Sequence, residues 1–313
     1  MSVEPRPAAA PANRWWVYQR ERFPLAGHGP LILAFSASAV ALSALLRGAW
    51  PSDRGVAGAF VSAFLFFFQL RVADEFKDAD DDRRFRPYRP VPRGLVALPE
   101  LARLGVAAAV VQLAAAWWLD PRLLAVLALV WAYMALLSQE FFVAEWLKVR
   151  PFTYLWSHML IVPLIDLYAT ACDWVAAGAT PPTGLGWFLA ASFFNGIVVE
   201  IGRKLRAPDD EETGVETYTA AWGRSRAIRS WIAALVLAAA SAAMASRGVH
   251  VSVIVATLGA LAVVGAVLAG IRFVRAPLAG AGKRFELFAG VWTLVMYLSV
   301  GILPLVAAWW RQP

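Results

Sequence analysis

The chain has 313 residues, of which 60% are hydrophobic and 16% are charged, and its formal net charge is +7. Soluble domains average about 45–50% apolar and about 25% charged residues, so this composition excludes a soluble protein. The single cysteine, Cys172, and three scattered histidines exclude a disulfide framework and a zinc centre built from either residue type.

Nine apolar stretches follow one another along the chain, and a bilayer core needs roughly 20 residues per helix. They are expected at 30–50, 56–73, 101–119, 122–143, 152–172, 185–202, 229–247, 249–271 and 286–310. Tryptophans such as Trp117 and Trp118 lie at several of their ends, as interfacial aromatic residues do. The sequence therefore predicts an all-α, polytopic membrane protein with nine transmembrane helices in a lipid bilayer.

The basic residues are distributed unevenly between alternate loops. If the N-terminus is cytoplasmic, the opposite side of the membrane carries only Arg47, Arg54, Arg122, Arg247 and Arg311. The positive-inside rule then predicts a cytoplasmic N-terminus and cytoplasmic loops after the second and sixth spans. We expect an integral protein of a bacterial inner membrane. The positive charge reflects this topology, and no nucleic-acid partner is expected.

The chain divides into a short N-terminal segment and one membrane domain. Residues 1–25 are predicted to be a cytoplasmic segment, of which the Pro/Ala-rich residues 1–12 are disordered. Residues 26–313 form a single transmembrane domain with two Asp-rich cytoplasmic loops, 74–100 and 200–228. Each loop follows the second helix of a four-helix stretch, which indicates a diverged internal repeat.

Most acidic residues lie in these two loops. In the first loop, Asp74, Asp78 and Asp82 recur every four residues, which places three carboxylates on one face of a continuing helix. Interleaved arginines and lysines would also allow a solvated face of salt bridges. Two carboxylate clusters at one membrane face instead favour Mg²⁺, which takes oxygen ligands and usually binds substrate phosphates as well.

Basic residues next to the acidic clusters are suited to the remaining phosphate oxygens of such a substrate. Metal ions and cations would together stabilise a departing diphosphate, and the apolar bundle would accommodate an isoprenoid tail. The predicted diphosphate-binding residues are Lys77, Lys148, Arg150, Arg203, Lys204 and Arg206.

With these motifs, nearly the whole chain resembles the UbiA superfamily of intramembrane prenyltransferases. The first family motif reads N-D-x-x-D-x-x-x-D, and this chain has Asp74-Glu75-x-x-Asp78-x-x-x-Asp82. Asp74 replaces an asparagine and Glu75 replaces an aspartate, so both positions keep an oxygen donor. The family's R-P-x-P/S-x-G-like turn is matched by the segment 89–94.

The second family motif reads roughly D-x-x-x-D-x-x-x-G-x-x-T. The chain supplies Asp210-x-x-x-Gly214-x-x-Thr217, but Arg206 stands where the leading acid is expected. One metal position is therefore built differently or is replaced by the arginine cation. Lys148, at the end of the fourth span, lies where the family commonly has a diphosphate-binding lysine.

The resemblance implies a bundle of nine helices around a central cavity. It also implies Mg²⁺-dependent transfer of an isoprenyl group from a polyprenyl diphosphate to a lipophilic or aromatic acceptor, with release of pyrophosphate. The residues expected to be catalytic are Asp74, Asp78 and Asp210. The expected metal ligands are Asp74, Glu75, Asp78, Asp82, Glu200, Asp209 and Asp210.

Two alternatives remain open. A membrane terpene cyclase of the same fold would act on a prenyl diphosphate without an acceptor. A transporter is disfavoured, because the acidic clusters lie in loops at one membrane face rather than at midplane. Within the spans, His158 either accepts a proton from the acceptor substrate or hydrogen-bonds a neighbouring helix.

Overall fold

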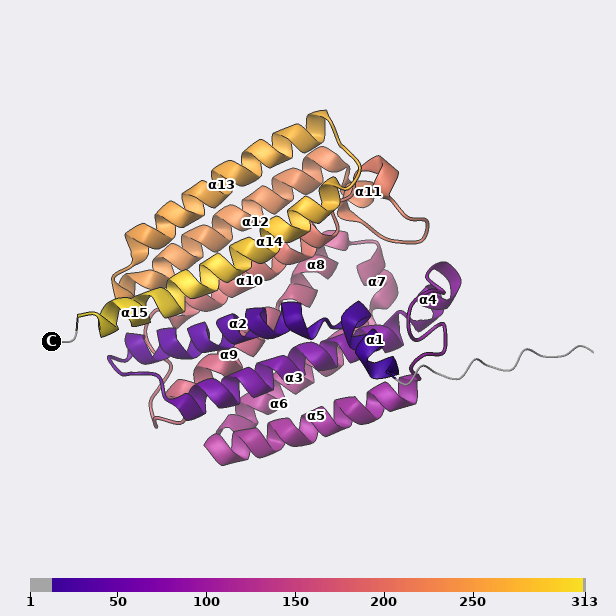
Figure 1. Ribbon diagram of the computed structural model, residues 1–313. Helices are drawn as coiled ribbons and strands as arrows, with labels where there is room; N and C mark the ends of the chain where they lie inside the picture. The colour runs from indigo at the N-terminus through magenta and orange to yellow at the C-terminus, as the bar shows by residue number, and fades with distance from the viewer. Residues whose placement is uncertain (1–12, 312–313) are drawn as a thin grey trace, which may run out of the picture.

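The computed structural model describes residues 13–311, so the predicted disorder of residues 1–12 lies outside the described part of the chain. All regular secondary structure within residues 13–311 is helical. The long helices run side by side in an elongated bundle (Figure 1). Eight helical segments of the described chain are long and apolar enough to cross a membrane, so this is an integral membrane protein.

The helices agree closely with the predicted spans. The fourth span is the least regular, because its helix has only 16 residues and ends at Ser138. The chain then turns through Glu140, Phe141 and Phe142, all of which have positive φ angles. The helices of the bundle are α2 (Leu25–Leu46), α3 (Asp53–Lys77), α5 (Leu98–Leu119), α6 (Leu123–Ser138), α8 (Pro151–Met159), α9 (Ile161–Trp174), α10 (Leu185–Arg203), α12 (Arg224–Ala245), α13 (Ser252–Arg275), α14 (Ala281–Tyr297) and α15 (Leu303–Trp309).

Local sequence explains where several helices begin. The hydroxyl of Ser52 accepts a hydrogen bond from the Gly55 amide at 3.0 Å, which caps the start of α3. Pro151 occupies the first turn of α8, where its missing N–H costs nothing. Helix α14 continues into α15 through a π-helical turn at Leu298–Ile302.

The centre of the bundle is helix α10, which packs against α9, α12 and α14. Small residues allow these close approaches: a Cβ on Gly202 would lie 3.1 Å from the Cβ of Ala289 and 3.2 Å from Nε1 of Trp231. The outer helices α5 and α13 expose large apolar side chains, such as Val106 and Val253. This outer surface suits contact with lipid.

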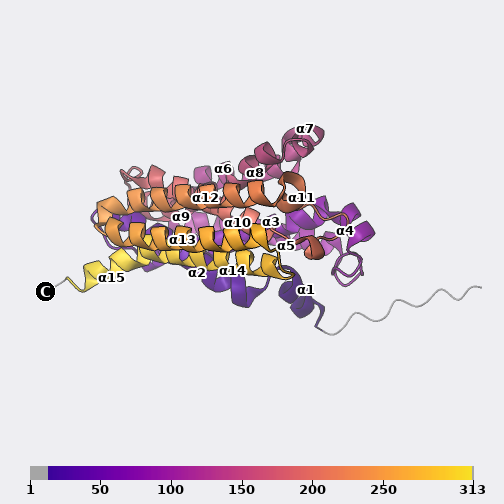
Figure 2. The same ribbon diagram turned by 90° about the horizontal axis from the view of Figure 1, so that it is seen from above.

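Short elements gather at one end of the bundle, which we call the polar end (Figures 1 and 2). Helix α1 joins this end through ion pairs of Arg22 with Glu75 and of Arg14 with Glu100. The short elements here are α1 (Arg14–Arg22), α4 (Ala79–Phe85), η1 (Glu140–Phe142), α7 (Ala144–Lys148), η2 (Pro208–Asp210) and α11 (Tyr218–Trp222).

The opposite end of the bundle contains a partly buried ion pair between the end of α2 and α9. The guanidinium of Arg47 contacts both carboxylate oxygens of Asp173, at 2.9 and 2.7 Å. The hydroxyl of Ser43 donates to the same carboxylate at 2.7 Å. The Asp173 carboxylate raises the pKa of Arg47 above its ordinary value. This pair holds the first span against the fifth.

Candidate active site

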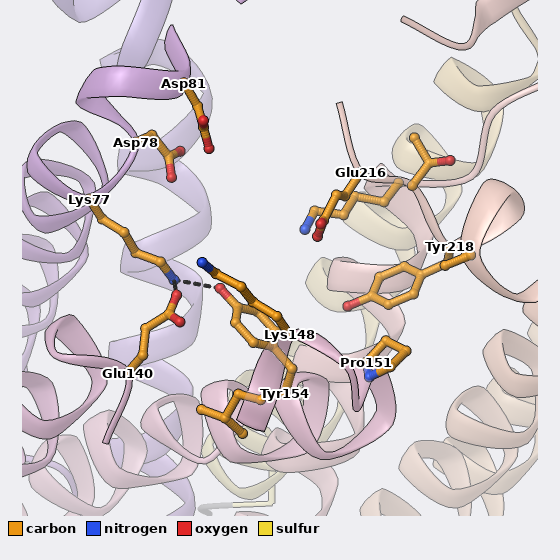
Figure 3. A pocket seen from close by; sticks show the side chains of 13 residues that line it. Lys77, Asp78, Asp81, Glu140, Lys148, Pro151, Tyr154, Glu216 and Tyr218 are labelled. Atoms are coloured by element: carbon orange, nitrogen blue, oxygen red, sulfur yellow. Dashed lines mark hydrogen bonds and ion pairs between the residues drawn. The ribbon is translucent and has the colours of Figure 1, made fainter. Parts of the chain in front are cut away.

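A cavity of about 470 Å³ lies at the polar end, between α3, α4, α8, α10 and the loop before α11. Apolar side chains form part of its wall, among them Leu70, Leu137, Met159 and Ile161. A smaller pocket of about 190 Å³ adjoins it, and the two share Lys77, Asp78, Asp81, Tyr154, Lys204 and Glu216. Figure 3 shows the smaller pocket, with Asp78 and Asp81 on one side and Glu216 and Tyr218 on the other.

The first acidic motif reaches the cavity at the junction of two helices. Asp74 lies in the last turns of α3, and Asp78 is the residue between α3 and α4. The sequence predicts that Asp74, Asp78 and Asp82 share one helix face. Because α3 ends at Lys77, only Asp74 and Asp78 face the cavity together. Asp81 lines the cavity in place of Asp82.

Arginines pair with three acids of this motif, and Asp74, which contacts Arg71 at 3.3 Å, is the only one of the three that lines the cavity. Asp82 is 1% exposed, and its carboxylate accepts a hydrogen bond from Arg89 at 2.7 Å and pairs with Arg86 at 3.2 Å. Glu75 is 2% exposed and is hydrogen-bonded by Arg22. Neither Glu75 nor Asp82 lines the cavity. Both predicted metal ligands therefore lie in ion pairs in this structure.

The second half of the chain contributes mainly cations to the cavity. Glu200, at the end of α10, is 7% exposed and lines the cavity together with Arg203 and Lys204. Its carboxylate accepts a hydrogen bond from Arg203 at 2.5 Å and pairs with Lys204 at 3.0 Å. These contacts neutralise the one buried acid that α10 brings to the site.

The remaining predicted residues of the second motif lie elsewhere. Arg206, Asp209 and Asp210 line a separate pocket of about 360 Å³, next to the turn between α13 and α14. The Asp210 carboxylate accepts a hydrogen bond from the Gly280 amide at 2.7 Å. The guanidinium of Arg206 donates to the Leu205 carbonyl at 2.9 Å. The structure does not bring these three residues together with Asp74 and Asp78.

Of the two basic residues around α7, only Lys148 faces the site. Lys148 lines the smaller pocket and pairs with Glu145 at 2.9 Å, and this contact raises the pKa of the lysine. Arg150 donates to the Trp146 carbonyl at 3.0 Å, and its guanidinium lies 4.3 Å from the centre of that indole ring. Arg150 lines neither pocket.

Lys77 is fixed between two partners at the junction of the pockets (Figure 3). Its ammonium lies 2.6 Å from a carboxylate oxygen of Glu140 and donates a hydrogen bond to the hydroxyl of Tyr154. The left-handed backbone of η1 places Glu140 here. The predicted diphosphate-binding lysine is therefore oriented by residues from two later segments.

The acidic wall of the cavity fits a divalent cation. Burial and the carboxylates of Asp74 and Asp82 raise the pKa of Asp78 above its ordinary value. A cation bound nearby would stabilise the ionised carboxylate and lower this pKa again. Within residues 13–311, no three acidic, histidine or cysteine groups already enclose a metal position. Mg²⁺ commonly keeps water and substrate phosphate oxygens among its ligands, so a site completed by substrate needs fewer protein carboxylates. The acids of the first motif region that line the cavity are Asp74, Asp78 and Asp81.

The cationic wall of the cavity fits an anion with several oxygens. Nη2 of Arg22 and Nε of Arg71 are buried without a hydrogen-bond partner among the described residues. Buried N–H groups of this kind normally have an acceptor, and phosphate oxygens are strong acceptors for guanidinium groups. The basic residues that line the cavity are Arg22, Arg71, Lys77, Arg86, Arg89, Arg203 and Lys204.

Several cavity residues were not predicted as ligands from the sequence. Arg71 precedes Asp74 by three residues, a spacing that places both on one helix face. This spacing indicates that Arg71 reaches the same site as Asp74. Glu216 lies between Gly214 and Thr217 of the second motif, where a signal also existed. Tyr154 and Arg22 reach the site through tertiary packing, which no local spacing reveals.

Comparison with known proteins identifies the family. The model of the UbiA prenyltransferase family matches residues 32–292, which is most of the chain. The chain therefore belongs to the UbiA prenyltransferase family, whose members are intramembrane prenyltransferases. A comparison with curated protein sequences gives no significant match.

Solved structures share the fold at low sequence identity. A UbiA homologue from Aeropyrum pernix K1 superposes with a TM-score of 0.64 at 15% identity, over 90% of this chain and 98% of the homologue. A digeranylgeranylglyceryl phosphate synthase gives 0.60 at 13% identity, over 94% and 99% of the two chains. An Archaeoglobus fulgidus homologue bound to DMAPP and Mg²⁺ gives 0.59 at 13% identity, over 91% and 99%.

Proposed function

We propose that this protein transfers an isoprenyl group from a polyprenyl diphosphate to a lipophilic or aromatic acceptor, in a Mg²⁺-dependent reaction that releases pyrophosphate. The observation that carries the proposal is the cavity itself, which combines carboxylates, basic side chains and an apolar wall. Family membership supports the reaction class. The homologue from Archaeoglobus fulgidus with bound DMAPP and Mg²⁺ supports the substrate and the metal.

In the proposed reaction, Asp74, Asp78 and Asp81 hold Mg²⁺ on the acidic wall. The bound ion supplies charge neutralisation for the departing diphosphate. Arg71 and Lys77 contact the diphosphate from α3, and they favour cleavage of the prenyl C–O bond because negative charge develops on the leaving oxygen. The apolar residues of the wall exclude water from the prenyl chain.

We propose that Arg203 and Lys204, at the end of α10, take the place of a second metal ion. They supply the positive charge that a metal bound to a second acidic motif would otherwise supply. Their contacts with Glu200 leave that carboxylate without spare charge for an ion. The roles predicted for Asp209 and Asp210 would need the loop after α10 to approach the cavity when substrate binds. Comparing Asp78→Asn with Asp210→Asn distinguishes these two arrangements.

We further propose that the polar end faces the cytoplasm of a bacterial cell. The lysines and arginines of the chain concentrate in the loops that form this end, as the positive-inside rule requires. Water-soluble metal and diphosphate would then reach the cavity directly, whereas a hydrophobic acceptor would enter from the bilayer.

The proposal is tested by incubating the detergent-purified protein with farnesyl, geranylgeranyl or longer diphosphates, Mg²⁺ and a membrane-lipid extract. We expect pyrophosphate release that EDTA abolishes, together with a prenylated product identified by mass spectrometry. Asp78→Asn should abolish release. Asp80→Asn is the matched control, because the Asp80 side chain is 94% exposed and outside the cavity.

Three outcomes would change the proposal. No Mg²⁺-dependent release by folded protein at any prenyl length would reject it. Release without an added acceptor, with a cyclic hydrocarbon as product, would indicate a terpene cyclase. Substrate uptake into proteoliposomes without release of pyrophosphate would indicate a transporter.

A further inference from the structure

His158 is a buried histidine that lines the cavity near its apolar wall. It lies in α8 and is 7% exposed. Its Nδ1 lies 2.8 Å from the carbonyl oxygen of Tyr154. A carbonyl oxygen can only accept a hydrogen bond, so Nδ1 carries the hydrogen of the neutral imidazole. The other ring nitrogen, Nε2, is then left with a free lone pair.

This lone pair has no donor in the described structure. Nε2 of His158 is buried and has no hydrogen-bond partner among residues 13–311. Buried polar atoms are almost always paired, so an orphan acceptor in a cavity wall points to a ligand that supplies the missing hydrogen. The expectation that His158 hydrogen-bonds a neighbouring helix is wrong, because the polar contacts of its ring, with the Tyr154 carbonyl and with the Ser157 hydroxyl at 3.4 Å, are both within α8.

The imidazole is also held in a fixed orientation. The ring of Tyr154 stacks on it with centroids 3.8 Å apart and planes 17° apart. Phe141 meets it edge-on at 6.0 Å. Tyr154 is itself fixed by its hydrogen bond from Lys77. A group held in this way loses little orientational freedom when it takes part in a reaction.

We propose that Nε2 of His158 accepts the proton that the acceptor substrate loses when it is prenylated. This step rests on the proposed function. The prenyl C–O bond breaks, and its electron pair leaves with the diphosphate. An electron pair of the acceptor forms the new bond to the same prenyl carbon, and the proton of the acceptor passes to Nε2. The imidazolium then returns the proton to water in the open cavity.

The acceptor class follows from this step. It must carry a removable proton at the atom that is attacked or next to it, as a phenol-like aromatic ring or an alcohol does. A histidine that takes this proton contributes about 10²–10⁴-fold in rate when general base catalysis operates.

The test compares His158→Gln with His28→Gln. His28 is the matched control, because its Nδ1 also lies near the carbonyl oxygen of the residue four positions earlier, Pro24, at 3.1 Å, and its ring contacts that of Phe23 at a tilt of 31°. His28 does not line the cavity. With geranylgeranyl diphosphate, Mg²⁺ and the lipid extract, we expect His158→Gln to form about 10²–10⁴-fold less prenylated product. His28→Gln should keep the wild-type rate.

Two further measurements separate proton transfer from a structural role. Added imidazole should restore product formation in His158→Ala, because it fits the space of the missing ring. In ¹⁵N-histidine NMR spectra of the wild-type protein, which has three histidines, the signal lost in His158→Gln should show hydrogen on Nδ1. An unchanged product rate in His158→Gln, no rescue by imidazole, or hydrogen on Nε2 would overturn the proposal. A wild-type protein that releases no pyrophosphate would overturn the proposed function and this step together.

Discussion

Glu75 and Arg22 form a buried ion pair that joins the end of α3 to the N-terminal helix α1. Their side chains are 1% and 10% exposed. Asp74, the preceding residue, instead lines the cavity. Adjacent acids of one motif thus have different surroundings, and substitution of each should have a different effect.

We expect Glu75→Ala to destabilise the protein by about 3–5 kcal/mol, because it leaves the Arg22 guanidinium buried without its partner. The double variant Glu75→Gln with Arg22→Met should recover much of this loss. Thermal unfolding in detergent measures both. A Glu75→Ala protein that melts like the wild type but no longer binds Mg²⁺ would instead support the metal-ligand role predicted from the sequence.

Mg²⁺ binding should depend on pH through Asp78. The raised pKa of Asp78 means that its carboxyl keeps its proton to a higher pH than an ordinary aspartate, whose pKa is about 3.9. As the pH falls, Mg²⁺ must displace this proton, so the apparent Mg²⁺ affinity should decrease. Titrations of Mg²⁺ at several pH values measure the effect.

The same shift predicts a gain in stability for Asp78→Asn. A carboxyl whose pKa is raised in the folded state costs more free energy to ionise there than in the unfolded state. As the pH rises through that pKa, the free energy of unfolding therefore decreases. The neutral amide of Asp78→Asn does not ionise and avoids this decrease in stability. The metal-free variant should therefore have a higher melting temperature than the wild type at neutral pH. A lower melting temperature would contradict the electrostatic interpretation.

The ion pair at the opposite end of the bundle should contribute to stability without affecting the site. Asp173→Ala leaves Arg47 and Ser43 without their acceptor, and we expect a loss of about 2–3 kcal/mol, between the values for exposed and buried pairs. Asp80→Ala, which removes an exposed pair with Arg83, should cost less than about 1 kcal/mol. Chemical or thermal unfolding distinguishes them, and equal losses would contradict the prediction.

Gly301 marks a close contact between the π-turn and α2. A Cβ at this position would lie 2.4 Å from the Cα and the carbonyl oxygen of Ser38. Gly301→Ala should therefore destabilise the protein by about 1–3 kcal/mol through overpacking. Gly290→Ala is the matched control in α14, where nothing lies within 4 Å of the added atom. It should be neutral or slightly stabilising, and a similar loss in both variants would contradict this packing argument.

The sequence predicted the membrane helices well because hydrocarbon thickness imposes a length and an apolar composition on each. Hydropathy extends the fourth span to residue 143, whereas its helix ends at Ser138, since the residues after Ser138 are still largely apolar. Their left-handed backbone is a tertiary feature that places Glu140 against Lys77. Hydropathy alone cannot distinguish such a turn from the end of a span.

The sequence predicts the site residues that follow helical spacing. It does not predict those that tertiary packing brings to the cavity. Asp74 and Asp78 reach the cavity as their four-residue spacing indicates. Asp82 does not, because a one-residue interruption between α3 and α4 turns Asp81 inward. Arg22 is far from the motif in sequence, and only the folded position of α1 brings it to Glu75.

The excess of basic side chains around the cavity has a consequence for turnover. In an enzyme of the proposed kind, the leaving group is itself a multivalent anion, and it departs from a cavity lined by seven basic and five acidic side chains. The contacts that favour bond cleavage therefore also retain the product. A rapid first turnover followed by a slower steady state, with escape accelerated by salt, is the kinetic behaviour that this charge distribution favours.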